Sequence, residues 1–446
     1  MRLHSSRRWT LLAPLLTTAL LSGTPTYADH GRRADYEVWL VDQSNSAGVT
    51  HGGKIHIYDD RELEGRNPSA AQPIDVIDLA GATSALCLAA TGANPTRPHM
   101  ILFNSRYSHA VLSFVASGHV VIFDAVSRQP VSCIRTTAGA GGARQAHAAF
   151  PAPDDSYILV ANQNGKLLER IDTDYQSGTF VLNPAATLDL AACTTPNGLP
   201  CQASGVRPDN APICPVVAPS SSLAFITLRG GGLFAVDPKP NPMAILAEYD
   251  ADTVHPNGCG GARAFGAMYL NSGGGTADNI SEFDVYRFPL RGYSPSNPPN
   301  VPAPQLVFRD NTTPDRDSHG MVVTANGLFL WVADRAANVA EVFWAPTGHH
   351  LVTVDLKSPF SADPTPDLAD VSPDGRLLFL ALRGPVPLSG DPHASTGSTP
   401  GLAIVRLEHG GLLGSVAGIA RISNIGADGV ERADAHGIRV RVTSRP

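Results

Sequence analysis

Residues 317–343, with the sequence DSHGMVVTANGLFLWVADRAANVAEVF, decide the fold. Three short apolar runs, at 321–323, 328–334 and 339–343, are separated by turn-forming residues such as Asn326 and Gly327. Short apolar runs that alternate with Asn, Asp and Gly turns are typical of antiparallel strands joined by hairpins. The stretch therefore predicts a unit of three strands connected by two hairpins.

The same unit recurs along the whole chain. Further copies lie at 99–124, 146–172, 214–237 and 367–407, and another copy ends at 284–286. The last copy is split between the two ends of the chain. Residues 434–440 have the form of a first strand, whereas 36–42 and 54–59 look like a second and a third strand that lack a first.

Joining these two ends completes the split unit and closes a ring. Closure removes the exposed sheet edge of the split unit, and β-propellers commonly lock their ring in this way. We therefore predict an all-β protein, a seven-bladed β-propeller whose N- and C-terminal strands share one blade, with 29–446 as a single domain. Two packed β-sandwich domains are the alternative, but a sandwich does not account for the split unit.

The N-terminus has the features of an export signal. Arg7 and Arg8 precede an apolar run at 11–21, and the small residue Ala28 ends a possible cleavage site before Asp29. This pattern predicts a signal peptide over 1–28 and a periplasmic or extracellular protein. Whether export follows the general or the twin-arginine route stays open. The apolar run is too short for a transmembrane anchor.

Composition narrows the classes of partner. The formal net charge is −7 and no basic stripe is present, so we expect neither nucleic acid nor anionic membranes as partners. A chain with 42 Gly, 37 Pro and 43% hydrophobic residues has many turns and enough apolar surface for a large core.

The chain has six cysteines, and an exported protein favours disulfides over free thiols. Cys193 and Cys201 are close in sequence and predict a local bridge. Position in the repeat favours two further pairs, Cys87 with Cys133 and Cys214 with Cys259. For the last pair, a role as thiolate metal ligands is a second interpretation.

In six repeats, a histidine or cysteine that could bind a metal stands at the start of the first strand. In a propeller these strands line the axis, so their side chains should converge there. The residues are His99, His147, Cys214, Cys259, His319 and His436, with Leu368 in the seventh repeat. The loops between second and third strands open on the same face and should complete a His, Arg and Asn-lined funnel for a small molecule. They supply Asp42, Asn104, Asn162, Asn164, Arg229, Asn271, Asp334, Arg335 and Arg383.

The units at 318–343 and 367–382 resemble the blades of the YVTN and lactonase-like seven-bladed propellers. The resemblance implies the fold, an exported or surface location and, in some members, enzyme activity. It carries over no catalytic residue. An inward ring of histidines also resembles, in architecture alone, the copper centres of nitrous oxide reductase and thiocyanate dehydrogenase.

Three functions remain open at this point. The first is a metal centre, with copper as the expected ion, at His99, His147, His319 and His436, because imidazole is a common ligand of copper and zinc. The second is metal-independent lactone chemistry, with His147 or His319 as general base and Arg229, Arg335 or Arg383 stabilising an oxyanion. The third is a non-catalytic binding propeller, in which the histidines have a structural role. Haem and dinucleotide motifs are absent from the sequence.

Overall fold

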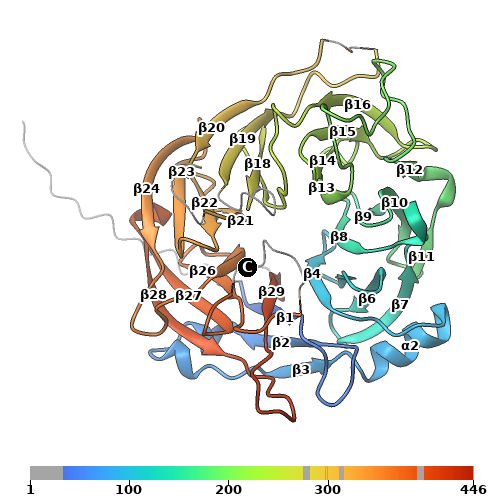
Figure 1. Ribbon diagram of the computed structural model, residues 1–446. Helices are drawn as coiled ribbons and strands as arrows, with labels where there is room; N and C mark the ends of the chain where they lie inside the picture. The colour runs from blue at the N-terminus through green and yellow to red at the C-terminus, as the bar shows by residue number, and fades with distance from the viewer. Residues whose placement is uncertain are drawn as a thin grey trace, which may run out of the picture. The chain divides into compact units, whose positions relative to one another are not determined.

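A computed structural model describes residues 34–274, 282–296, 298, 300–310, 316–388 and 396–444. The predicted signal peptide lies outside the described residues. The described chain forms seven antiparallel sheets that surround a central axis as the blades of a propeller (Figure 1). This arrangement confirms the predicted fold class and excludes two packed sandwiches.

Each blade has four main strands, and the strand that comes first in the blade lies nearest the axis (Figure 1). Blade 1 consists of β29(Ala435–Val442), β1(Tyr36–Asp42), β2(Lys54–Asp59) and β3(Asp75–Asp78). Blade 2 is β4(Pro98–Phe103), β5(His109–Phe114), β6(His119–Asp124) and β7(Gln129–Arg135). Blade 3 is β8(Ala146–Pro151), β9(Tyr157–Asn162), β10(Leu167–Asp174) and β11(Thr179–Leu182), and β12(Leu188–Asp189) also pairs with β10.

The remaining blades repeat this order. Blade 4 is β13(Pro212–Val217), β14(Ala224–Leu228), β15(Leu233–Asp237) and β16(Ala244–Tyr249). Blade 5 is β17(Gly261–Ala264), β18(Ala267–Gly273), β19(Phe283–Pro289) and β20(Gln305–Arg309). Blade 6 is β21(Ser318–Val323), β22(Phe329–Asp334), β23(Val339–Trp344) and β24(His349–Asp355), and blade 7 is β25(Pro366–Val371), β26(Leu377–Leu382), β27(Gly401–Glu408) and β28(Leu413–Arg421).

Blade 1 closes the ring as the split repeat predicts. Strand β29 pairs antiparallel with β1, with Tyr36 opposite Val442 and Leu40 opposite Ile438. The pairing gives β1, which would otherwise be an open edge, a partner from the far end of the chain.

Short helices occur in the connections between strands. They are α1(Asp60–Leu63), α2(Ala82–Thr91) and the 3-10 turns η1(Pro68–Ala70), η2(Ala140–Gly142), η3(Pro184–Ala186) and η4(His409–Gly411). Helix α2 was not expected from the sequence, and Cys87 within it forms a disulfide with Cys133 of β7. The other disulfides are Cys193–Cys201 and Cys214–Cys259, so the three bridges join the favoured pairs. In the described part of the chain, no helix has the length and apolarity needed to cross a membrane.

The hydrophobic core lies between neighbouring blades. Trp39 of blade 1 packs into one cluster with Leu112 of blade 2, and Trp331 of blade 6 into another with Leu378 of blade 7. Because each cluster draws on two adjacent sheets, the blades stabilise one another and hold their inner strands at fixed positions around the axis.

Candidate functional site

The innermost strands carry β-bulges near the axis. The pairing register shifts between Pro98 and Ile101, Ala146 and Ala148, Pro212 and Pro215, Ser318 and Met321, and Pro366 and Ala369, and in β29 between Ala435 and Ile438. A bulge leaves residues without a cross-strand partner and re-aims their side chains. The four predicted histidines, His99, His147, His319 and His436, all lie within these bulges.

The four histidines meet at the axis, as the repeat predicts. The rings of His99 and His436 stack with centroids 3.6 Å apart. His147 lies 4.6 Å from His99, and His319 lies 5.6 Å from His436, between ring centroids. Residues from four different blades therefore form one continuous group of imidazoles.

A carboxylate that the sequence analysis missed joins this group. Asp367 is fully buried, and its Oδ1 lies 3.0 Å from His319 Nε2 and 3.6 Å from His436 Nε2. The seventh repeat was expected to place Leu368 at this point, which is wrong by one residue. The bulge between Pro366 and Ala369 makes Asp367 the equivalent of His319, because Pro366 and Ser318 are the last paired residues before the two bulges.

The hydrogen bonds of His99 fix which of its ring nitrogens carries the proton. Gln43 Nε2 donates to Asp434 Oδ2 at 2.8 Å, because a carboxylate can only accept. The amide oxygen of Gln43 therefore faces His99 Nδ1, 3.1 Å away, and Nδ1 must donate. In the neutral ring this leaves Nε2 with a bare lone pair, and it has no hydrogen-bond partner in the described chain.

His436 is oriented in the same way. Its Nδ1 donates to the backbone carbonyl oxygen of His99 at 3.3 Å. The Nε2 of the neutral ring is then an acceptor that faces another acceptor, Asp367 Oδ1. Asp367 Oδ1 and His319 Nε2 are both buried, and their approach does not have the geometry of a hydrogen bond. The lone pairs of His436 Nε2 and Asp367 Oδ1 thus face each other, and Asp367 Oδ1 has no hydrogen-bond partner among the described residues.

Burial controls the charge of this group. Loss of solvation lowers the pKa of His99, His319 and His436 well below the ordinary value of 6.5, and neighbouring His and Arg side chains lower it further. Burial also raises the pKa of Asp367, against the attraction of Arg335 and Arg383. These three imidazoles are therefore neutral near pH 7, and each presents a lone pair.

The predicted arginines take part in buried ion pairs. Arg383 holds Asp434 with two hydrogen bonds of 2.7 and 2.9 Å and Asp367 Oδ2 with a third of 3.0 Å. Arg335 Nε donates to Asp317 Oδ2 at 2.8 Å. Both guanidinium groups therefore position carboxylates behind the histidines.

Two other predicted funnel residues lie apart from this group. The Arg229 side chain is 41% exposed and pairs with Asp209 at 2.7 Å. Asn104 was placed in a loop between second and third strands, which is wrong. It belongs to the turn between β4 and β5, at the other end of the blade, where it hydrogen-bonds Ser108 and Asp155.

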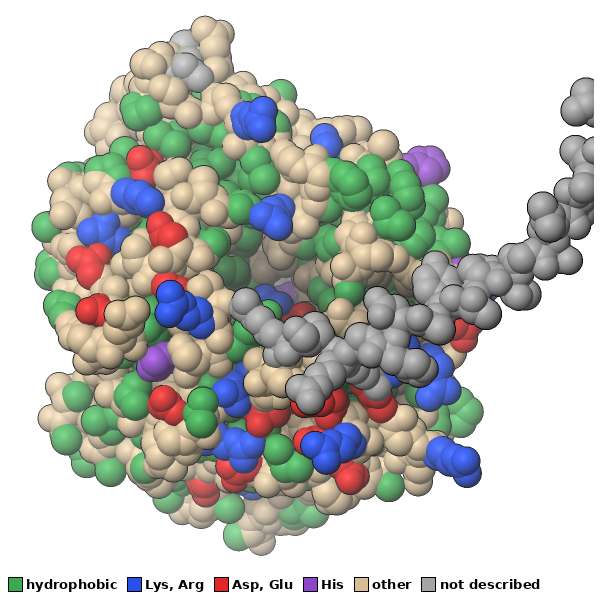
Figure 2. Space-filling view, turned by 180° about the vertical axis from the view of Figure 1, so that it is seen from behind, with side chains coloured by type: hydrophobic (Ala, Val, Ile, Leu, Met, Phe, Trp, Pro, Cys, Tyr) green, Lys and Arg blue, Asp and Glu red, His purple; other side chains and the backbone are tan. Residues whose placement is uncertain are grey.

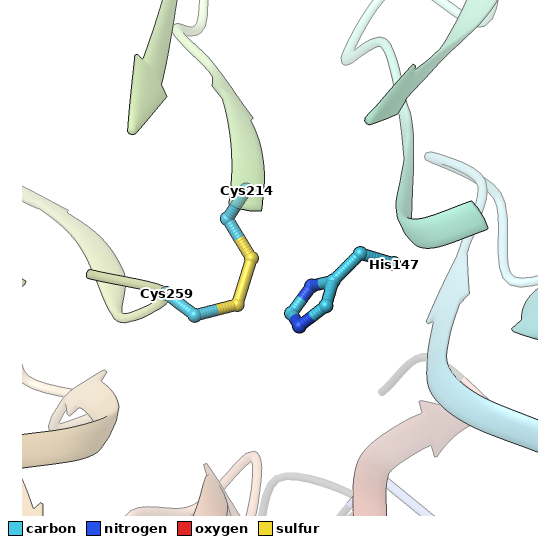
Figure 3. A group of neighbouring side chains, drawn as sticks. All are labelled: His147, Cys214 and Cys259. Atoms are coloured by element: carbon cyan, nitrogen blue, oxygen red, sulfur yellow. A yellow bond between two sulfur atoms is a disulfide. The ribbon is translucent and has the colours of Figure 1, made fainter. Parts of the chain in front are cut away.

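Sulfur atoms lie beside the imidazoles. The Cys214–Cys259 disulfide faces the ring of His147 (Figure 3). Both Sγ atoms lie 3.8 Å from Met100 Sδ. Cys214 was expected at the same strand position as the histidines, but the pairing register makes it the equivalent of Met100, one residue further along.

An apolar cavity and a hollow adjoin the axial group. The cavity, of about 30 Å³, is lined by residues that include Met100, Phe150, Met321, Leu368 and Ile438. Figure 2 shows a hollow at the centre of one face of the ring, with histidine and basic side chains visible at its bottom.

A second polar cluster, unforeseen from the sequence, lies in blade 5. His255 Nδ1 lies 2.8 Å from Asp284 Oδ2 and also contacts Glu282. Arg309 closes the cluster with two hydrogen bonds of 2.9 Å to Asp284. These contacts, led by the hydrogen bonds to Asp284 and Glu282, raise the pKa of His255 from 6.5 to about 9. With two cations and two carboxylates, the cluster is a charge-balanced ion-pair network.

This network predicts a pH-dependent contribution to stability. Because the folded-state pKa of His255 is raised, its contribution is complete below pH 6.5 and is lost as the pH rises through about 9. We expect His255→Gln to lower the free energy of unfolding by about 1–3 kcal/mol at pH 6 and by much less at pH 9.5. Urea unfolding at both pH values measures this, with the exposed His349→Gln as control. Equal losses at the two pH values would contradict the assignment.

Comparison with known proteins supports the fold and leaves the family open. No protein-family model and no curated protein matches the chain. Among solved structures, the periplasmic gluconolactonase of Pseudomonas aeruginosa superposes with a TM-score of 0.57 at 14% identity, covering 92% of this chain and 100% of that one. A provisionally assigned 6-phosphogluconolactonase of Bacteroides fragilis gives 0.56 at 12% identity, covering 91% and 98%. A Lactobacillus plantarum protein gives 0.55 at 9% identity, covering 91% and 99%.

Identities this low establish the fold alone. The expected resemblance to lactonase-like seven-bladed propellers is confirmed at that level, and the function must be argued from the site.

Proposed function

We propose that the axial group binds one transition-metal ion through His319, His436 and Asp367, with His99 as a further ligand. One observation carries the proposal: two acceptors, His436 Nε2 and Asp367 Oδ1, face each other 3.6 Å apart without a donor between them. Such a contact is repulsive in a buried site, and a cation between the two atoms makes it attractive.

The ligand chemistry and the groups behind it support the proposal. In metal-bound histidines, the N–H of the second ring nitrogen donates a hydrogen bond to a carbonyl or to a carboxyl-linked group. This hydrogen bond fixes the ring and raises its basicity. His436 meets this requirement through the carbonyl of His99, and His99 meets it through Gln43 and Asp434. Imidazole with one carboxylate suits copper, zinc and iron, and divalent copper has the highest intrinsic affinity of these ions. Copper is therefore our first assignment.

A bound copper ion would supply one-electron redox chemistry for a small molecule that enters through the axial hollow. The chain's own part is to hold neutral imidazoles in place, pair Asp367 with Arg383 and exclude bulk water from the buried group. The disulfides and the fold shared with a periplasmic gluconolactonase support an exported location.

Metal-independent lactone hydrolysis is the second candidate, because two structures of similar fold bear gluconolactonase names. Such a reaction needs a base and a donor for the oxyanion. Two of the three arginines proposed for that donor, Arg383 and Arg335, are buried in ion pairs with aspartates, and Arg229 lies apart from the axial group in a pair with Asp209. This engagement favours the metal centre.

Metal titration of the full chain tests the proposal. We expect one equivalent of copper per chain, and a loss of affinity of at least about 100-fold in His436→Ala, because a ligand of the ion is removed. His349→Ala, in the outermost strand of blade 6, is the matched control and should bind as the unaltered chain does. Binding well below one equivalent for copper, zinc and iron would refute the metal centre.

A lactone panel distinguishes the remaining candidates. Hydrolysis that survives a chelator and His436→Ala would support the second candidate. Absence of both metal and hydrolysis would favour a binding propeller.

A further inference from the structure

A set of soft ligands lies next to the proposed metal centre. Cys214 lies in β13 of blade 4 and Cys259 lies two residues before β17 of blade 5, so their bridge joins two neighbouring blades at the axis. Met100 Sδ from blade 2 lies 3.8 Å from each Sγ, and the imidazole of His147 from blade 3 points at the bridge (Figure 3). The ligand atoms of His147, Cys214 and Cys259 lie within 4.8 Å of one another.

We propose that the Cys214–Cys259 bridge covers a second metal site, which opens when the bridge is reduced and then binds a soft monovalent ion, Cu(I). Its ligands are the two thiolates, Met100 Sδ and the imidazole of His147. Thiolate and thioether sulfur select Cu(I) over harder ions. The site goes beyond the axial centre, because none of its sulfur ligands belongs to that centre.

The distances suit such an ion. Metal–sulfur bonds are about 2.3 Å long, so two such bonds to atoms 3.8 Å apart enclose an angle of roughly 110°. This angle is close to tetrahedral for each pairing of Met100 with a cysteine. When the bridge opens, the two Sγ atoms separate and can approach an ion from both sides of Met100. Three donors come from blades 2, 3 and 4 and the fourth from the segment before β17. The ligand atoms of His147 and the two cysteines lie within 4.8 Å of one another, and Met100 Sδ lies 3.8 Å from each Sγ.

Hydrogen bonds between blades hold the backbone at both cysteines in place independently of the bridge. Thr227 Oγ1 accepts from Cys214 N–H at 3.1 Å and donates to the carbonyl of Gly258. On the other side, Gly260 N–H donates to Asn271 Oδ1 at 2.7 Å, and Asn271 Nδ2 donates to the carbonyl of His319 at 2.8 Å. The Cys259 segment is thus tied to blade 6 as well as to blade 4, and we expect the ring to stay assembled after reduction.

Close packing reinforces this position. A Cβ at Gly258 would lie 1.8 Å from the carbonyl oxygen of Asn271, so only glycine fits there. Cys214 is fully buried and Cys259 is 3% exposed. Protein thiols therefore reach the bridge poorly, and a small reductant is the appropriate probe.

The redox step balances with a phosphine or a dithiol as reductant. A phosphine breaks the S–S bond, takes an oxygen atom from water and becomes the phosphine oxide, while the two water protons end on the two thiols. Binding of Cu(I) then forms two metal–thiolate bonds and releases both protons. The two electrons that reduce the bridge come from the phosphine, and the binding of Cu(I) changes no oxidation state.

The experiment compares Cu(I) uptake before and after reduction. The full chain is treated with a phosphine without oxygen and titrated with Cu(I) against a coloured Cu(I) chelator. We expect one further equivalent of Cu(I) after reduction, with sulfur neighbours in X-ray absorption. Met100→Leu should retain uptake with about tenfold lower affinity, because one thioether ligand is lost.

Two variants separate this site from other thiols and from the axial centre. The reduced Cys214→Ser/Cys259→Ser variant should lack the further equivalent, although its other two bridges still supply thiols. His436→Ala should keep it while losing the axial copper, so failure of the proposed function leaves this result unaffected. Equal uptake by the reduced serine variant would overturn the second site.

Far-UV circular dichroism checks that the open state is folded. A chain with serine at Cys87, Cys133, Cys193 and Cys201 restricts reduction to this one bridge. If reduction abolishes the β signal of both this chain and the unaltered one, no folded open state exists and the proposal is wrong.

Discussion

Replacing Arg383 by methionine is expected to lower the free energy of unfolding by about 3–5 kcal/mol, because it removes one partner from a buried charge network. Arg383 is 2% exposed and makes three hydrogen bonds to Asp434 and Asp367, both fully buried. Methionine fills much of the volume but leaves Asp434 without its cation and Asp367 with only the more distant Arg335, 3.6 Å away. Urea unfolding followed by tryptophan fluorescence measures the loss.

The matched control is Arg376→Met. Arg376 also pairs with an aspartate at 2.7 Å, but its side chain is 61% exposed, so water replaces the pair and the loss should stay below about 1 kcal/mol. Adding Asp434→Asn to Arg383→Met should recover part of the stability, because the buried charge that has lost its cation is then removed. Similar losses for Arg383→Met and Arg376→Met would show that burial of the network contributes little.

Removal of β29 should have the largest effect on the fold. A chain that ends at Asp434 lacks the inner strand of blade 1 and exposes the edge of β1. Loss of buried Ile438 and Val440 alone costs about 3–6 kcal/mol, a large part of the about 5–15 kcal/mol that holds a domain folded. We expect no cooperative thermal transition and a large fall in soluble yield.

A chain that ends at Val442 is the control for this truncation. It keeps the whole of β29 and lacks only the residues after it, so it should melt close to the full chain. An unchanged melting temperature in the chain ending at Asp434 would mean that ring closure through β29 is dispensable.

The fold could be predicted because turn chemistry repeats along this sequence. Asn326 and Gly327, and their counterparts in the other units, mark each hairpin regardless of what the strands pack against. The split unit predicted that the ring closes by pairing of the last strand with the first, as β29 does with β1. Helix α2 was missed because a single short helix in a connection has no repeat to reveal it, and its alternating small residues give only a weak helical pattern.

The axial group could be predicted in part. Four histidines at one position of the repeat identified the ring, but bulges set which neighbour faces the axis, and a bulge depends on cross-strand pairing that the sequence does not display. Asp367 was therefore passed over for Leu368, and Cys214 was placed one residue too early. Pro366 corresponds to Ser318 in the repeat, and this correspondence places Asp367 at the position of His319.

The hydrogen-bond and ion-pair partners behind the histidines could be identified only from the three-dimensional structure. Gln43 lies in the loop after β1 and reaches Asp434 from the other end of the chain. Arg335 and Arg383 were correctly placed near the axis, but their role as counter-ions of buried aspartates depends on burial, which residue type alone does not give.

Pairing of the first and last strands also makes the axial group depend on closure of the ring. His436 is near the end of the sequence and reaches the axis only on β29, after that strand has paired with β1. In a chain whose ring is still open, this imidazole would be missing from the axial group. The metal centre proposed above would therefore be complete only after closure of the ring.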